Sequence, residues 1–269
     1  MTSFCSKCGA ELAAGASFCH KCGSPVGTAS PPADLHRVLK VAGKPTVVIR
    51  QRVPGFVEVK TGASGEVVVD IEPRPPETVS WNVSQDGSVV TINSRIKDVF
   101  DWPGHFLSGS PRTNVHVVVP SESDLSIRNR VDRVSVAGVS GNLGVESTAG
   151  VVSLQNCSGV VQARTRAGEI ELGNIRGTVS AEASAGQITF SGSLSKGNNG
   201  FRTRVGDIKI TLQGEQDLRV EGYATIGKVT VLPELEGAHY DGREYVGRIG
   251  AGSGRLVVET TAGSITINH

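Results

Sequence analysis

Five cysteines occur in the chain, and four of them stand in two closely spaced pairs near its start. Cys5 and Cys8 form the first pair, Cys19 and Cys22 form the second, and a glycine follows each pair. A Cys-x-x-Cys-Gly turn aims two thiolates at one point, and two such turns supply tetrahedral sulfur coordination. The alternatives are a disulfide pair or a redox dithiol, and the latter requires a βαβ context that this segment lacks. The spacing therefore predicts a structural Zn²⁺ site with four cysteine ligands.

Four thiolates would complete the coordination shell of this zinc ion. No position is then left for an activated water molecule, so hydrolytic zinc chemistry is not expected. A module of this size cannot form a hydrophobic core, so the metal would supply its folding energy. Its only basic residues are Lys7 and Lys21, which is a small electrostatic footprint for nucleic acid. Whether the module binds protein or nucleic acid stays open at this stage.

A second candidate site lies between Lys97 and Arg112, where aromatic residues gather in a chain that has only 4% of them. Phe100, Trp102 and Phe106 stand close together there. An aromatic loop of this kind is typical of a partner-binding loop. The alternative, which we favour, is a hydrophobic lid that folds over an open end of the core.

No catalytic motif is found along the chain. None of the six histidines stands in a metalloprotease pattern, and neither a nucleophile elbow nor a phosphate-binding loop is present. Acidic residues at Glu169, Glu171 and Asp207 are interrupted by Gln187 and Lys209, which is typical of a solvated strand face. We therefore predict no catalytic residues and no enzymatic activity.

The rest of the chain is organised by a repeat between Ser126 and Pro233, with one more copy at Val258–Ile267. Each copy has a central glycine, two apolar residues two and four positions after it, and polar residues between them. This is the alternation of a strand with one buried face. Glycine tolerates the backbone of a tight corner, and a fixed short period is the mark of a solenoid. The sequence predicts an all-β fold, a single β-solenoid with coils of about 18 residues.

Charge alternates along this repeat at the fourth residue before the central glycine. The series is Arg128, Glu146, Arg164, Glu182 and Arg202, with Asp132 in the glycine position of the first coil. Adjacent strands would place opposite charges side by side, which contributes about 0.2–1 kcal/mol per pair. The alternation predicts which side chains stack. An anion or nucleic-acid patch at Arg164, Arg166, Arg202 and Arg204 is the less favoured interpretation, because the interleaved glutamates offset the arginines.

Composition completes the expected organisation. We expect a zinc ribbon at residues 1–24, a linker rich in Pro, Ser and Ala at 25–35, and the solenoid at 36–269. The segment 234–255 loses the repeat pattern and would form a looped-out turn or a hairpin, and the last copy would complete the stack. Net charge is +1, which gives no general attraction to nucleic acid. Cysteines in metal spacing, with neither a signal segment nor a membrane-spanning run, predict a cytoplasmic protein.

The ordered set HVVVP, then coils ending in I-x-I/L, then GRIGAGSGRLVVETTAGSITI resembles the prokaryotic adhesin-like β-strand-repeat domain, also called the toastrack domain. The resemblance extends over about Leu35–His269. The segment Cys5–Gly23 resembles the short zinc-ribbon domain found at the start of prokaryotic proteins. The resemblance implies a β-helix-like fold without established enzymatic activity, in envelope-stress or cell-surface contexts.

Together these features favour a non-enzymatic zinc-binding scaffold or adaptor, whose solenoid is a surface for protein partners or self-association. The alternatives are a surface adhesin and a regulator that binds nucleic acid through the ribbon; near-neutral charge makes nucleic acid the less favoured partner.

Overall fold

The computed structural model describes residues 3–4, 11–12, 35–97 and 110–269. The chain divides into two compact units, Met1–Ala33 and Asp34–His269. In the first unit, β1 (Ser3–Phe4) pairs antiparallel with β2 (Glu11–Leu12).

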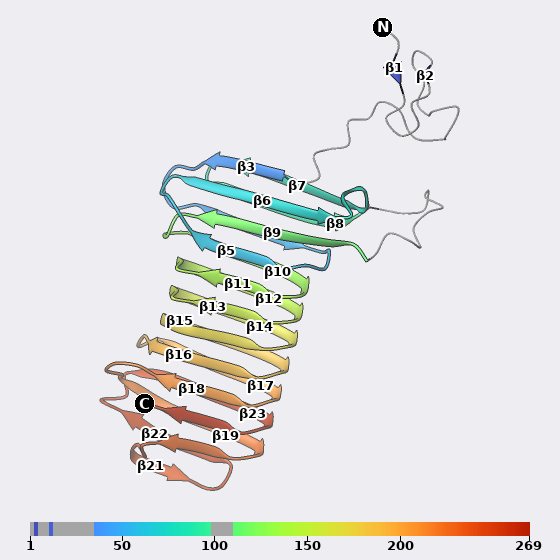
Figure 1. The fold of residues 1–269 in the computed structure, drawn as a ribbon. Coiled ribbons are helices and arrows are strands. Elements are labelled where there is room, and N and C mark those ends of the chain that lie inside the picture. Colours follow the sequence, from blue (N-terminus) through green and yellow to red (C-terminus); the bar gives the residue numbers. More distant parts are fainter. Residues whose placement is uncertain (1–2, 5–10, 13–34, 98–109) are drawn as a thin grey trace. The chain divides into compact units, whose positions relative to one another are not determined.

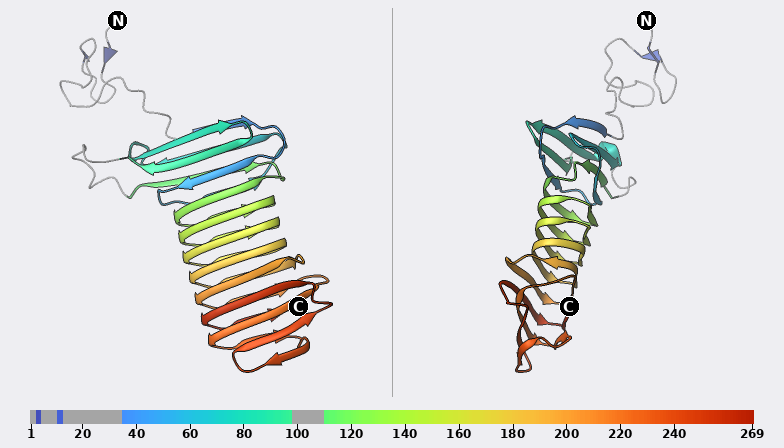
Figure 2. Two further views of the ribbon diagram at one scale, coloured as in Figure 1. Left: turned by 180° about the vertical axis from the view of Figure 1, so that it is seen from behind. Right: turned by 90° about the vertical axis from the view of Figure 1, so that its left-hand side faces the viewer.

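The second unit is a stack of coils, each made of two strands joined by a tight corner (Figure 1). Strands in equivalent positions of successive coils pair in parallel and form two sheets, and β15 is long enough to contribute to both. Figure 2 shows the same stack from behind and from the side, where it is narrower. The predicted β-solenoid is confirmed. The repeat strands are β10 (Asp124–Val131), β11 (Val134–Ala137), β12 (Ser140–Ala149), β13 (Val152–Gln155), β14 (Ser158–Ala167), β15 (Ile170–Ala185), β16 (Ile188–Leu194), β17 (Asn198–Val205) and β18 (Ile208–Leu212).

Strand alternation places one side of every coil in a continuous core. The apolar residues that follow each glycine, such as Ile170 and Leu172, are almost fully buried, as the repeat predicts. Phe190 and Phe201 are buried in this core, with ring centroids 5.1 Å apart. Burial of large side chains of this kind stabilises each coil against its neighbours, by about 1.5–3 kcal/mol per residue.

The corners depend on glycine because the backbones of successive coils lie very close together there. Gly168 has a φ of +139°, and a Cβ atom at this position would lie 1.8 Å from the carbonyl oxygen of Gly150. Asp132 occupies the glycine position of its coil, as the sequence predicts, and it also has a positive φ of 97°. Its carboxylate accepts a hydrogen bond from the Arg133 N–H at 2.8 Å, which satisfies the tight turn.

Antiparallel strands close the first end of the stack. β4 and β5 form the first coil and pair in parallel with β10 and β11, and β8 and β9 pair with them on the other side. β7 then pairs antiparallel with β8, and β6 and β3 continue antiparallel from β9. Together these strands cap the first coil. Its elements are β3 (Leu35–Lys40), β4 (Thr46–Gln51), β5 (Val57–Thr61), β6 (Glu66–Arg74), the 3-10 turn η1 (Pro76–Thr78), β7 (Val79–Asp86), β8 (Val89–Ile96) and β9 (Arg112–Val119).

The other end of the stack differs from the sequence prediction in the order of its coils. The last coil, β23 (Gly254–Ala262) and β24 (Ile265–Asn268), lies between the coil of β17 and β18 and the coil of β19 (Leu218–Ile226) and β20 (Val229–Leu232). The prediction that the final copy completes the stack is therefore wrong. After β18 the chain leaves one coil position empty and forms the outermost coil with β19 and β20. It then returns and fills the empty position with β23 and β24.

The irregular segment 234–255 provides the connection for this return. It forms an antiparallel hairpin, β21 (Glu236–Tyr240) and β22 (Glu244–Ile249), and β22 pairs antiparallel with the free side of β19. The hairpin alternative for this segment is confirmed. It closes the second end of the stack by the same means as the first.

Candidate functional site: a charged groove along the stack

An open groove of about 1210 Å³ crosses the strands of one sheet. It extends over eight strands, in the order β4, β10, β12, β14, β15, β17, β23 and β19. Its lining comes from the last residues of each strand before the corner, where side chains point alternately outward and into the core. Eight arginines and three glutamates line it.

Two outward rows of side chains form the groove, and we name them the pairing row and the open row. The pairing row consists of Arg50, Arg128, Glu146, Arg164, Glu182, Arg202, Glu259 and Tyr223, in spatial order. The open row lies two residues further along the same strands and consists of Arg52, Arg130, Thr148, Arg166, Ser184, Arg204, Thr261 and Thr225.

The pairing row contains the predicted charge alternation. The strand register places Arg128 beside Glu146 and Arg164 beside Glu182, and their Nε–Oε2 distances are both 3.1 Å. The predicted stacking of side chains is confirmed. The series also continues into the inserted coil, where Arg202 Nε lies 2.7 Å from Glu259 Oε2. These pairs are about half exposed, so each contributes at most about 1 kcal/mol.

Beneath the two rows, a row of small polar residues fixes the corner. The Ser147 hydroxyl donates to the Ala149 carbonyl at 3.2 Å, and the Thr260 hydroxyl donates to the Gly206 carbonyl at 3.0 Å. Thr203 makes an equivalent bond to Gly186. The Ala149 oxygen also accepts from the Asp132 N–H at 3.2 Å, so at that corner the hydroxyl adds a second hydrogen bond to the same oxygen.

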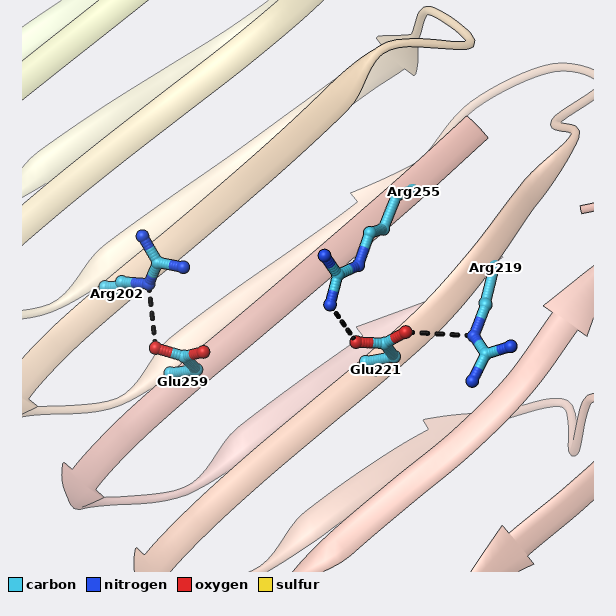
Figure 3. A network of polar contacts seen from close by, with 5 residues as sticks. All are labelled: Arg202, Arg219, Glu221, Arg255 and Glu259. Atoms are coloured by element: carbon cyan, nitrogen blue, oxygen red, sulfur yellow. Dashed lines mark hydrogen bonds and ion pairs between the residues drawn. The ribbon is translucent and has the colours of Figure 1, made fainter. Parts of the chain in front are cut away.

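A carboxylate with unusual burial stands on β19, two residues before the groove residue Tyr223 (Figure 3). Glu221 is only 9% exposed at its side chain, and its two oxygens accept hydrogen bonds from separate arginines. Arg219 Nε donates at 2.9 Å and Arg255 Nη2 donates at 2.7 Å. The hydrogen bond from Arg255 is the main cause that lowers the pKa of Glu221 below its usual value, and burial opposes it. Because Arg255 belongs to β23, this network ties the inserted coil to β19.

None of the site residues that the sequence predicts lies in the groove or elsewhere in the part of the chain that the structure describes. Cys5, Cys8, Cys19, Cys22, Phe100, Trp102 and Phe106 all lie outside the described residues. The donor set itself fits zinc, because two Cys-x-x-Cys-Gly motifs supply four thiolates, the soft ligands of structural zinc sites. Within the described ranges, no three His, Cys, Asp or Glu side chains are grouped to hold a metal ion.

Cys157 is the one cysteine that the structure describes. It is buried at a corner, and burial raises the pKa of its thiol. A raised pKa disfavours the reactive thiolate. This side chain is therefore a small residue of the core.

Comparison with known families identifies both parts of the chain. Residues 4–26 match the zinc-ribbon domain. Residues 121–268, more than half of the chain, match Toastrack DUF4097. The chain belongs to the Toastrack family. The matched Toastrack region begins just before β10 and includes every coil of the repeat as well as the inserted one.

Several solved structures align with this Toastrack chain over most of its length. A candidate cell adhesion protein from Clostridium sporogenes is 9% identical with a TM-score of 0.33, and the alignment covers 87% of this chain and 99% of that one. A candidate adhesin from Bacteroides fragilis is 10% identical with a TM-score of 0.37, covering 88% and 98% of the two chains. A candidate lipid binding protein from Parabacteroides distasonis is 10% identical with a TM-score of 0.25, covering 89% and 97%.

A search of curated proteins finds no match to this Toastrack chain. In the part of the chain that the structure describes, no helix has the length and apolar character needed to cross a membrane.

Proposed function

We propose that this protein is a non-enzymatic scaffold or adaptor. The zinc ribbon docks to a protein partner, and the solenoid presents a rigid lateral surface for a second interaction. The observation that carries this proposal is the closure of both ends of the stack together with an open groove along its side. A solenoid closed in this way offers its flanks, not its ends, for recognition.

The edges of the sheets support lateral recognition. Parallel coils with an exposed last strand would stack end to end with a second copy. Here β21 and β22 extend one sheet antiparallel beyond β19, and β3 forms the antiparallel edge at the other end. His36, Arg37 and Lys40 are exposed on that edge strand, and charged edge residues discourage pairing with another chain. Self-association, if present, would therefore use the flanks.

The zinc ribbon has a structural part in this proposal. Cys5, Cys8, Cys19 and Cys22 would hold one Zn²⁺ ion, which organises the short module in place of a core. Zinc-bound thiolates and the buried thiol of Cys157 are suited to a reducing compartment. We therefore also propose a cytoplasmic location, and fractionation of expressing cells with compartment markers tests it. Recovery in the envelope fraction would contradict the location without affecting the scaffold proposal.

The test of the ribbon combines metal analysis with partner recovery. We expect about one zinc ion per chain in the purified protein, and none in Cys5→Ser/Cys19→Ser, with Cys157→Ser as the control for the loss of a thiol. The double variant should retain the far-ultraviolet spectrum of the solenoid, since the two units are separate. Quantitative mass spectrometry of co-purified proteins should show a partner that is retained by the control and lost by the double variant. Identical partners in all three samples would contradict the docking role.

A further inference from the structure

The open row of the groove contains arginines without counter-ions. Among the described residues, the side chains of Arg130, Arg166 and Arg204 make no ion pair or hydrogen bond. The side chains of the pairing-row arginines on the same strands are bound to glutamates. All three are exposed. The expectation that the glutamates offset the arginines is therefore wrong for this row, because each glutamate binds an arginine of its own row.

The groove consequently has a net positive charge. Its lining includes eight arginines against three glutamates and contains neither lysine nor aspartate. Guanidinium groups bind carboxylates through two parallel hydrogen bonds, and a row of unpaired guanidinium groups is suited to an anionic ligand of extended shape. Charge complementarity therefore points to a polyanion that lies along the stack, across the strands.

The spacing of the open row narrows the choice of polyanion. Between β10 and β17, Arg130, Arg166 and Arg204 occur on every second strand, so they are about 9.6 Å apart, whereas Arg52 follows β4, the strand next to β10. The strands between them place Thr148 and Ser184 in the same row, with exposed hydroxyl groups. A ligand that matches this row has an anionic group on every second unit and a neutral, hydroxylated unit between. Polysaccharides with one acidic sugar per disaccharide have this pattern.

Other polyanions fit less well. A polymer with an anion on every unit would bring charges beside Glu146, Glu182 and Glu259, which lie on the strands between the arginines and at the end of the row. Single-stranded nucleic acid is bound by aromatic side chains on which bases stack. The only aromatic residue lining the groove is Tyr223, at the end of the pairing row.

We propose that the groove binds a linear anionic polysaccharide that carries one carboxylate per disaccharide. The polymer lies along the stack with its carboxylates on Arg130, Arg166 and Arg204 and its neutral sugars beside Thr148 and Ser184. This inference goes beyond the scaffold proposal and does not depend on the zinc ribbon.

The test uses the full chain and a fluorescently labelled hyaluronan fragment of about four disaccharides, which matches the length of about 34 Å spanned by eight strands. Binding is measured by fluorescence anisotropy at low salt and at physiological salt. We expect saturable binding that weakens with salt, and weaker binding per carboxylate to polygalacturonate, in which every sugar is acidic. Neutral dextran should not compete.

The variant Arg130→Gln/Arg166→Gln/Arg204→Gln should bind hyaluronan about 30-fold more weakly, since exposed charge-assisted contacts contribute about 3-fold each. The matched control Arg176→Gln/Lys209→Gln/Lys228→Gln removes the same charge outside the groove and should change affinity less than about 2-fold. Both triple variants affect exposed side chains, and thermal unfolding verifies their folding.

A second variant reverses the expected specificity. Thr148→Arg/Ser184→Arg fills the open row with arginine on successive strands, so the preference should shift from hyaluronan toward polygalacturonate. Equal loss of affinity in the two triple variants would overturn the proposal. So would tighter binding of single-stranded DNA or inorganic polyphosphate than of hyaluronan.

Discussion

Replacement of Glu221 by glutamine tests whether the inserted coil is held by its buried carboxylate. Hydrogen bonds to charged groups contribute about 1.5–3 kcal/mol each. The partners Arg219 and Arg255 are 61% and 55% exposed, so solvent screening reduces this contribution. Glutamine retains one acceptor oxygen and the shape of the side chain. We therefore expect Glu221→Gln to lower the free energy of unfolding by about 1.5 kcal/mol.

The matched control for this variant is Glu182→Gln. Glu182 is 39% exposed and bonds to one arginine, so its loss should cost at most about 0.5 kcal/mol. Urea denaturation followed by circular dichroism measures both values at pH 7. An equal cost for the two variants would refute the reasoning, because it would show that burial and the second arginine add nothing.

The pH dependence of the same difference gives an independent measurement. The pKa of Glu221 in the folded protein is lowered from its usual value of 4.5, mainly by the hydrogen bond from Arg255. The folded state thus binds fewer protons than the unfolded chain, and the stabilisation is complete above pH 4.5. It declines as the pH falls through the lowered pKa. The gap between wild type and Glu221→Gln should therefore narrow below pH 4.5 and stay constant above it.

The corners and the coil order allow two further predictions. Gly168→Ala should lower stability by at least about 3 kcal/mol in urea denaturation, because its Cβ would meet a backbone oxygen. Gly200→Ala has open space around the new atom and should change stability by less than about 0.5 kcal/mol. Arg202→Cys/Glu259→Cys should form a disulfide under mild oxidation, since adjacent strands are about 4.8 Å apart. Arg202→Cys/Tyr223→Cys joins strands that have β23 between them, so it should not form a disulfide. On non-reducing gels, a disulfide in this second variant and none in the first would contradict the coil order.

Much of the fold could be predicted from the sequence because each coil contacts mainly its neighbours. The glycine corners, the alternating core residues and the series from Arg128 to Arg202 all follow from one local period. The register then fixes the charge pairs without any long-range information. The antiparallel cap at the first end was also accessible, since its strands are separated by turn residues.

The order of the last coils could not be predicted from the period alone. It depends on the pairing of β23 with β17, which is distant in the sequence. One signal was nevertheless present. Glu259 continues the alternation after Arg202, whereas Tyr223, the corresponding residue of the preceding copy, does not. The positive charge of the open row was underestimated because the charges of all the outward residues were added together. The repeat frame itself separates the rows: Glu146 and Glu182 stand four residues before a central glycine, whereas Arg166 stands two residues before one.

The closure of both ends has a consequence for how the length of such a protein can change. A repeat added after β24 would find no free parallel strand, because β23 and β24 already have a neighbour on each side. Gain or loss of coils must therefore occur in the interior of the stack, between β10 and β17. The charge alternation adds a parity rule, since one extra coil would put like charges side by side, whereas two would preserve every pair. Natural length variants and engineered extensions of this solenoid should differ by even numbers of coils.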